Sequence, residues 1–119
     1  MGKRSRRRGS EEISAPASEY RDSEGNVLVL RGALSPATRR QYSEVAAGSP
    51  LSREDAWQRS VEFLFERLAV SWQIAGTDPI SKPKELLGRF RMASQEERRF
   101  VRESLRTHTA SHFPELHVP

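Results

Sequence analysis

The sequence predicts a mainly α protein, a small helical domain of about four helices with one N-terminal β-hairpin and a disordered basic N-terminal tail. Three observations lead to this fold class. The stretch 52–75 repeats apolar side chains at helical spacing. Caps and helix breakers divide the following residues into shorter helices, and an early turn precedes a β-branched run.

Length and composition favour a single domain at 19–119 behind a tail at 1–18. The chain has 119 residues, of which 35% are hydrophobic and 30% are charged, and this is enough for one small core. Residues 1–18 hold one large apolar residue, Ile13, so we expect this segment to be disordered. Because the chain has no cysteine and no long apolar run, we expect a cytoplasmic protein that does not span a membrane.

The net charge of +4 comes from the tail rather than from the domain. The first eight residues contain five basic side chains and no acidic one, namely Lys3, Arg4, Arg6, Arg7 and Arg8. Without them, 15 basic residues stand against 16 acidic ones. Short basic tails bind phosphate backbones or acidic partners in some proteins and only aid solubility in others, so the sequence leaves both interpretations open.

The segment 19–32 is expected to form the hairpin. Gly25 and Asn26 have turn chemistry. The strand that follows them is Val27, Leu28, Val29 and Leu30. Because a lone hairpin is marginally stable and leaves an unpaired edge, we expect this strand to pack on the helices or to dock on another chain.

Four helices are expected, at 35–47, 52–75, 82–92 and 95–112. Ser35 and Pro36 form a typical helix start, and Ser94 with a glutamate three residues later is a capping box.

The helix at 52–75 is the expected organiser of the core. One face carries Trp57, Val61, Leu64, Phe65, Leu68 and Trp72. Phe63 and Val70 lie off this face, so the helix is expected to carry apolar surface on more than one side.

The pair His108 and His112 is the first pattern that suggests chemistry. His108 and His112 lie one helical turn apart, but the glutamate of the H-E-x-x-H zinc motif is replaced by Thr109 and the helix is broken at Pro114. We therefore expect solvent-exposed histidines and no metal. No nucleophile elbow or phosphate-binding glycine loop is present, so we expect neither an enzyme, nor a cofactor, nor a small-molecule substrate.

The last two helices resemble a helix-turn-helix, because a short turn joins them and the second presents Arg98, Arg99 and Arg102. Glu96 and Glu97 occupy the start of that second helix, where DNA would approach, so an ordinary solvated helix face is the favoured interpretation.

The order YRDSEGNVLVLRGAL, then EFLFERLAVSWQIAGTDPI, then KELLGRF resembles the layout of small tail-assembly proteins of actinobacterial phages. In that layout a β unit precedes a helix that ends near a tryptophan, and a Gly/Pro turn and a short helix follow. The corresponding residues are Trp72, Gly76, Pro79, Ile80, Glu85 and Leu86. The resemblance spans roughly residues 20–90 and implies chaperoning of a tape-measure or tail-tube protein.

Together these features predict a non-enzymatic protein-interaction or assembly module that binds a protein partner or a second copy of itself. The expected docking residues are the strand at 27–30 together with Phe63 and Val70. The alternative is a nucleic-acid-binding protein that uses the basic tail and the basic segment 82–106, with Arg98, Arg99 and Arg102.

Overall fold

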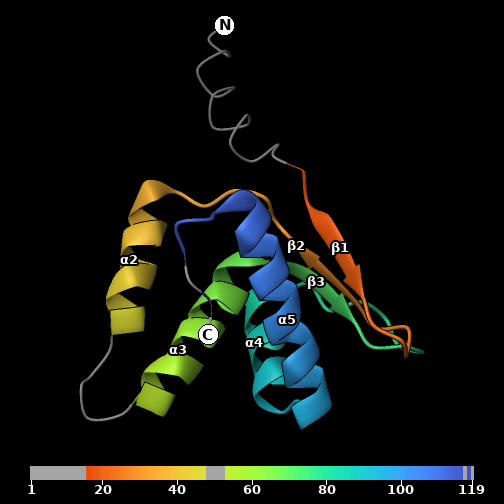
Figure 1. Cartoon of the computed structure of the whole chain (residues 1–119). Helices are drawn as coiled ribbons and strands as arrows, with labels where there is room; N and C mark the ends of the chain where they lie inside the picture. The colour runs from red at the N-terminus through yellow and green to blue at the C-terminus, as the bar shows by residue number, and fades with distance from the viewer. Residues whose placement is uncertain (1–15, 48–52, 117, 119) are drawn as a thin grey trace, which may run out of the picture.

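The computed structural model describes residues 16–47, 53–116 and 118. This part of the chain confirms the predicted class, a mainly α domain of four helices with a small antiparallel sheet (Figure 1). The strands are β1 (Ser18–Arg21), β2 (Val27–Leu30) and β3 (Ala69–Gln73). The helices are α2 (Pro36–Ala47), α3 (Arg53–Leu68), α4 (Pro83–Arg91) and α5 (Gln95–His112). The predicted tail lies outside the described residues up to position 15, and its last residue, Ser18, begins β1.

The predicted helix at 52–75 is wrong in its last turns. Helix α3 ends at Leu68, and the next residue begins strand β3, which carries Trp72. In β3, Val70 and Trp72 are side chains that suit a pleated strand, and the strand pairs along β2 with Leu28 opposite Trp72. Helix periodicity over so few residues is ambiguous, and the free edge of the hairpin decides the conformation. The predicted position of the helix start, residue 52, lies outside the described residues.

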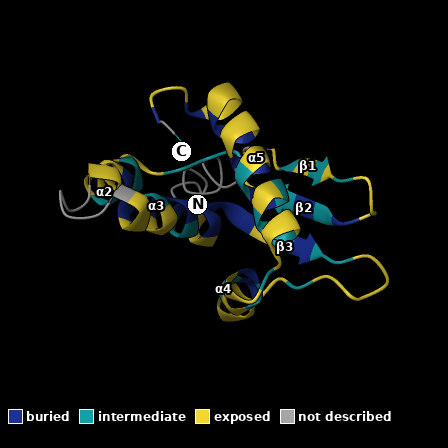
Figure 2. Cartoon of the chain, turned by 60° about the horizontal axis from the view of Figure 1, so that its bottom comes forward, coloured by how far each residue is buried: buried dark blue, intermediate teal, exposed yellow. Residues whose placement is uncertain are grey.

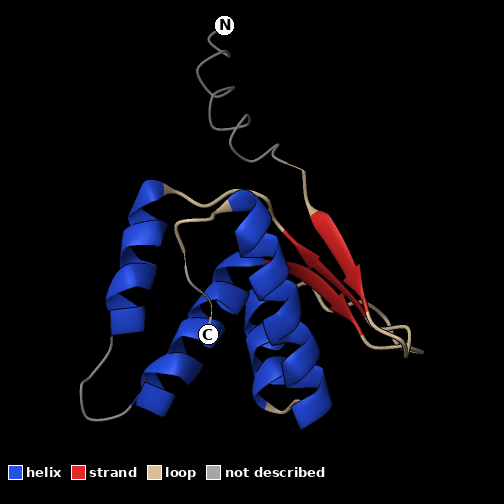
Figure 3. Ribbon diagram, in the orientation of Figure 1, coloured by secondary structure: helices blue, strands red, loops and turns tan. Residues whose placement is uncertain are grey.

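The sheet has the order β1-β2-β3, and both pairings are antiparallel (Figure 3). Strand β2 is therefore central. The other three helix predictions agree with α2, α4 and α5 to within one residue at each end.

The helices pack beside the sheet and on one another. Helix α2 packs on α3, α3 packs on α4 and α5, and α5 also contacts β2. In Figure 1 the sheet lies at the right, and α5 crosses in front of α4. Helix α2 lies at the left, on the side of α3 that faces away from the sheet.

One core joins these layers, and its buried residues are dark blue in Figure 2. The face predicted for α3 is confirmed for Val61, Leu64, Phe65 and Leu68, which are buried. Trp57 is only half-buried at the edge of that face. The largest side chains of the core are aromatic. The ring centroid of Phe65 lies 4.8 Å from that of Phe90 and 5.7 Å from that of Trp72. One core therefore joins Trp72 of β3 to the buried face of α3.

Polar contacts fix the turns at the ends of the strands and at the start of α5. Asn26 is buried; its side-chain Nδ2 donates to Asp22, and its Oδ1 accepts the backbone N–H of Ala75 at 2.8 Å. Gly25 in the same turn has φ +90°, a value that favours glycine. The predicted capping box at the start of α5 is present, with Ser94 and Glu97 bonded to each other's backbone N–H.

Candidate protein-interaction site

The strand that was expected to offer a docking edge is enclosed on both sides. Leu28 pairs with Tyr20 of β1 and with Trp72 of β3. Leu28 and Leu30 are fully buried, and the two valines of β2 are half-buried. The prediction of an unpaired edge at Val27, Leu28, Val29 and Leu30 is therefore wrong, because residues assigned to the long helix form a third strand along it. The edge strands are β1 and β3.

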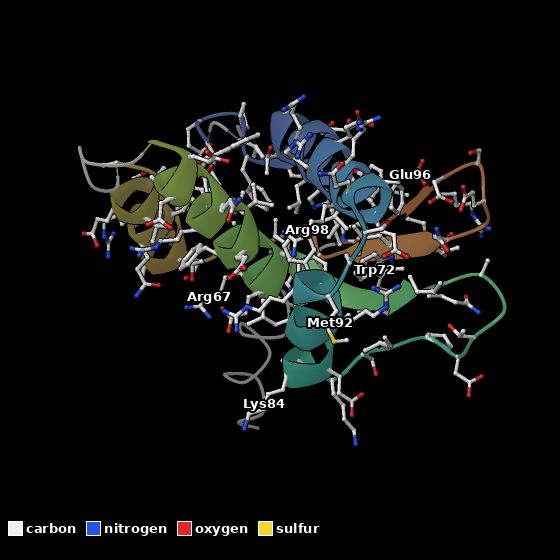
Figure 4. All side chains as sticks on the ribbon, turned by 90° about the horizontal axis from the view of Figure 1, so that it is seen from below. Arg67, Trp72, Lys84, Met92, Glu96 and Arg98 are labelled. Atoms are coloured by element: carbon white, nitrogen blue, oxygen red, sulfur yellow. The ribbon has the colours of Figure 1, made fainter. Side chains whose placement is uncertain are left out.

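Phe63 and Val70 do not form one open apolar face. Phe63 is half-buried, with its ring 6.3 Å from Tyr42 and the Arg67 guanidinium 4.8 Å above its centroid. Val70 is 36% exposed on β3. In the described part of the chain, the exposed large hydrophobic residues are Val70 and Met92 (Figure 4 labels Met92). Two such residues do not make a contiguous patch of the size that marks an apolar interface.

Arginines cover much of the aromatic surface instead. In the described residues, five guanidinium groups lie 4.8 to 5.7 Å from ring centroids, a distance typical of cation–π contacts. The pairs are Arg39 over Phe113, Arg67 over Phe63, Arg89 over Trp72, Arg98 over Phe90 and Arg102 over Trp57. These arginines use their apolar stems and planar heads to shield rings at the edge of the core.

A groove of about 290 Å³ lies between α3 and the α4–α5 pair. Its lining combines apolar and basic side chains: Trp57, Gln58, Val61, Glu62, Phe90, Gln95, Arg98, Arg99 and Arg102. Trp57 is half-buried in this lining, whereas Val61 and Phe90 are buried beneath it. The groove therefore joins core aromatics to the basic face of α5.

Two of the three groove arginines are held in defined positions. Arg98 lies over Phe90 at 5.7 Å and donates to the backbone carbonyls of Arg91 at 2.7 Å and Ala93 at 3.3 Å (Figure 4). Arg102 lies over the Trp57 ring at 5.2 Å. Arg99 is exposed. Two of the three arginines proposed for reading DNA are thus engaged with the protein's own side chains or backbone. Lys3, Arg4, Arg6, Arg7 and Arg8 lie outside the described residues.

Glu97, in the first turn of α5, serves the fold. Glu97 accepts from Arg89 at 2.8 Å, and this pair is the most sheltered ion pair of the described residues. The neighbouring guanidinium and the capping bonds hold the pKa of Glu97 below its usual value despite partial burial. Glu97 therefore connects α4 to α5 as well as capping the helix.

The expectation of two exposed histidines is wrong for His108. Its ring is fully buried, because it lies seven residues after Val101 on the inner face of α5. The ring nitrogens bridge two other elements, with Nδ1 3.0 Å from the Tyr20 hydroxyl and Nε2 2.8 Å from the carbonyl oxygen of Arg31. His112 is exposed, as expected, with its ring 4.4 Å from that of His108.

Burial lowers the pKa of His108, and the nearby His112 lowers it further, although the Arg31 carbonyl acts in the opposite direction. A neutral ring satisfies both contacts, because Nε2–H donates to the carbonyl and Nδ1 accepts from the tyrosine hydroxyl. His108 is thus a structural link between β1, the segment after β2 and α5. Within the described residues, no group of three or more histidine, aspartate or glutamate side chains is arranged to hold a metal ion.

The groove was missed because its two walls are distant in sequence. Helical periodicity predicts that Trp57 belongs wholly to the core, and the sequence predicts that the arginines of α5 form a separate solvated face. The available signal was the spacing of Gln95, Arg98, Arg99 and Arg102, which places polar side chains on one stripe next to the buried face of α5. Only the packing of α5 against α3 brings this stripe beside Trp57.

Comparisons with protein-family models, with curated proteins and with solved structures each find no match. In the described residues, no helix has both the length and the apolar character needed to cross a bilayer.

Proposed function

We propose that this chain is a non-enzymatic protein-interaction module that holds an apolar side chain of a partner protein in the groove between α3 and α5. The single observation that carries the proposal is the groove itself, which is lined by the half-buried Trp57 together with the buried Val61 and Phe90. Partly exposed tryptophan in a preformed pocket, surrounded by arginine, is the composition that dominates binding energy at protein interfaces.

The size of the groove supports the capture of a side chain rather than of a small metabolite. A volume of about 290 Å³ lies just below the usual range for small-molecule pockets, and it suits one large apolar residue presented by a helix or loop. The rest of the interface would lie on the polar rim around it.

This proposal changes the docking residues but keeps the class of function expected from the sequence. The layout that resembles phage tail-assembly proteins supports an assembly role, with one departure: Trp72 lies in strand β3 rather than at the end of a helix. A tape-measure or tail-tube protein would be a partner of the kind this resemblance implies. The lack of cysteine supports a reducing compartment such as the cytoplasm.

A direct test uses a synthetic helical peptide with leucine at positions i, i+3, i+4 and i+7 and glutamine elsewhere, titrated by calorimetry. Trp57→Ala should weaken binding roughly 30-fold, because removal of a central tryptophan costs about 2 kcal/mol or more at an interface. Gln58→Tyr, at an exposed position of the lining, should block the groove without disturbing the core. Met92→Ala is the matched control, because Met92 is 83% exposed and does not line the groove.

Two results would overturn the proposal. One is equal affinity of Gln58→Tyr, Met92→Ala and the parent protein. The other is the absence of peptide binding together with binding of duplex DNA that weakens steeply with salt and is lost when Lys3, Arg4, Arg6, Arg7 and Arg8 are replaced by glutamine. That outcome would favour the nucleic-acid alternative. Sedimentation of the parent protein and of Gln58→Tyr tests self-association through the groove, because a dimer that is lost in Gln58→Tyr would place a second copy there.

A further inference from the structure

The groove carries positive charge that no ion pair among the described residues neutralises. One of its arginines, Arg99, also borders a neighbouring hollow that is lined by Glu24, Glu96 and Glu103. In the described residues, each of five arginines has a carboxylate oxygen within 3.1 Å; these are Arg21, Arg39, Arg59, Arg89 and Arg91. None of these ion pairs involves Arg98, Arg99 or Arg102, the three arginines of the groove.

The acidic side chain of the groove is already occupied. Glu62 accepts from Arg91 at 3.1 Å, so its carboxylate is turned to a guanidinium that does not line the groove. The lining therefore presents three positive charges and one compensated negative charge. The chain without its basic N-terminal residues has a net charge close to zero. The excess of positive charge at the groove is therefore local and not a property of the whole surface.

The positions of these arginines also favour a specific contact. The heads of Arg98 and Arg102 rest on Phe90 and Trp57, so little side-chain freedom is left to lose when an anion binds. Arg99, next to Arg98, is exposed and adds a third head at the rim. Guanidinium groups fixed beside an apolar seat match a carboxylate that is carried near an apolar side chain.

We infer that the partner segment held by this groove is acidic, with an apolar residue seated beside the half-buried Trp57 and carboxylates facing Arg99 and Arg102. This inference rests on the proposed function and adds the chemistry of the partner. An acidic protein segment is favoured over duplex nucleic acid, because paired and stacked bases offer no apolar group that could enter the groove between α3 and α5. Single-stranded nucleic acid, whose bases can stack on tryptophan, is a separate outcome of the test.

The test compares two helical peptides with the same leucine anchors, one with glutamate and one with lysine at the flanking positions. Binding is followed by the fluorescence of Trp57; a Trp57→Phe variant supplies the background from Trp72, which is fully buried. The glutamate peptide should bind at least roughly tenfold more tightly at low salt, and the difference should shrink as salt is added.

Charge reversal locates the effect. Arg99→Glu should weaken the glutamate peptide and strengthen the lysine peptide, each by roughly twofold to tenfold, the range for one or a few exposed charge pairs. A variant that is merely misfolded would weaken both. The matched control is Arg40→Glu, which reverses an exposed arginine on α2 away from the groove and should leave the preference unchanged.

The outcomes separate the two proposals. Equal binding of both peptides, still lost in Gln58→Tyr, would overturn the acidic-partner inference and leave the interaction module standing. No binding of either peptide would overturn both. A preference for glutamate that Arg40→Glu reduces as much as Arg99→Glu would show a general charge effect and overturn the groove as its site. Displacement of the glutamate peptide by a single-stranded oligonucleotide at equal concentration would replace the acidic segment with nucleic acid.

Discussion

Replacing Leu64 with alanine tests the packing between helix α3 and the rest of the core. Leu64 is 0% exposed and belongs to the cluster that joins α3 to the sheet and to α5. The change removes three carbon atoms, and at about 0.8 kcal/mol for each methylene group the lost transfer energy is about 2.4 kcal/mol. A cavity that does not collapse adds to this loss, so the free energy of unfolding should fall by about 2–5 kcal/mol.

A loss of this size is a large part of the stability of a small domain, which is typically about 5–15 kcal/mol. Urea unfolding followed by circular dichroism measures it, and tryptophan fluorescence serves as a second probe of the same transition. Met92→Ala, at an 83% exposed position, should change the free energy of unfolding by less than about 0.5 kcal/mol. A change below about 1 kcal/mol in Leu64→Ala, with an unchanged slope against urea, would refute the assignment of this face to the core.

Three further predictions concern polar contacts. The pKa of His108 is lowered in the folded state, so the unfolded chain binds more protons as the pH falls. The stability that comes from this ring is therefore complete above about pH 6.5 and is lost as the pH falls below that value. His108→Gln should flatten this part of the curve of stability against pH. Asn26→Ala should cost about 1–3 kcal/mol, because the N–H of Ala75 loses its acceptor. Ser94→Ala should cost about 1 kcal/mol through loss of the cap of α5.

Each of these has its own control in the chain. His112→Gln removes an exposed imidazole and should leave most of the pH dependence intact; loss of that dependence would assign it to His112 instead. Asn26→Ala also removes the bond from Nδ2 to Asp22, so Asp22→Ala is the control; an equal loss of stability in Asp22→Ala would assign the effect to the Asp22 contacts and not to Ala75. Ser94→Asp keeps a capping oxygen, so its thermal unfolding midpoint should be close to that of the parent protein.

Local chemistry alone determined three of the four helices. Capping and breaking residues such as Ser94 act within a single turn, so α5 could be predicted over its full length. The inner face of α3 was also predictable, because Val61, Leu64, Phe65 and Leu68 repeat at helical spacing and any helix must bury such a face.

The tertiary structure decided the elements in which distant segments meet. Residues 69–73 fit a helix by periodicity, but pairing with β2 covers the edge of the hairpin and makes them a strand. The same pairing closes the docking edge expected at 27–30. His108 is buried because Tyr20 and Arg31 reach it from β1 and from the segment after β2, and neither is near it in sequence. The groove exists only because α5 places its arginine stripe beside Trp57, and no pattern within one segment encodes the contact between two helices.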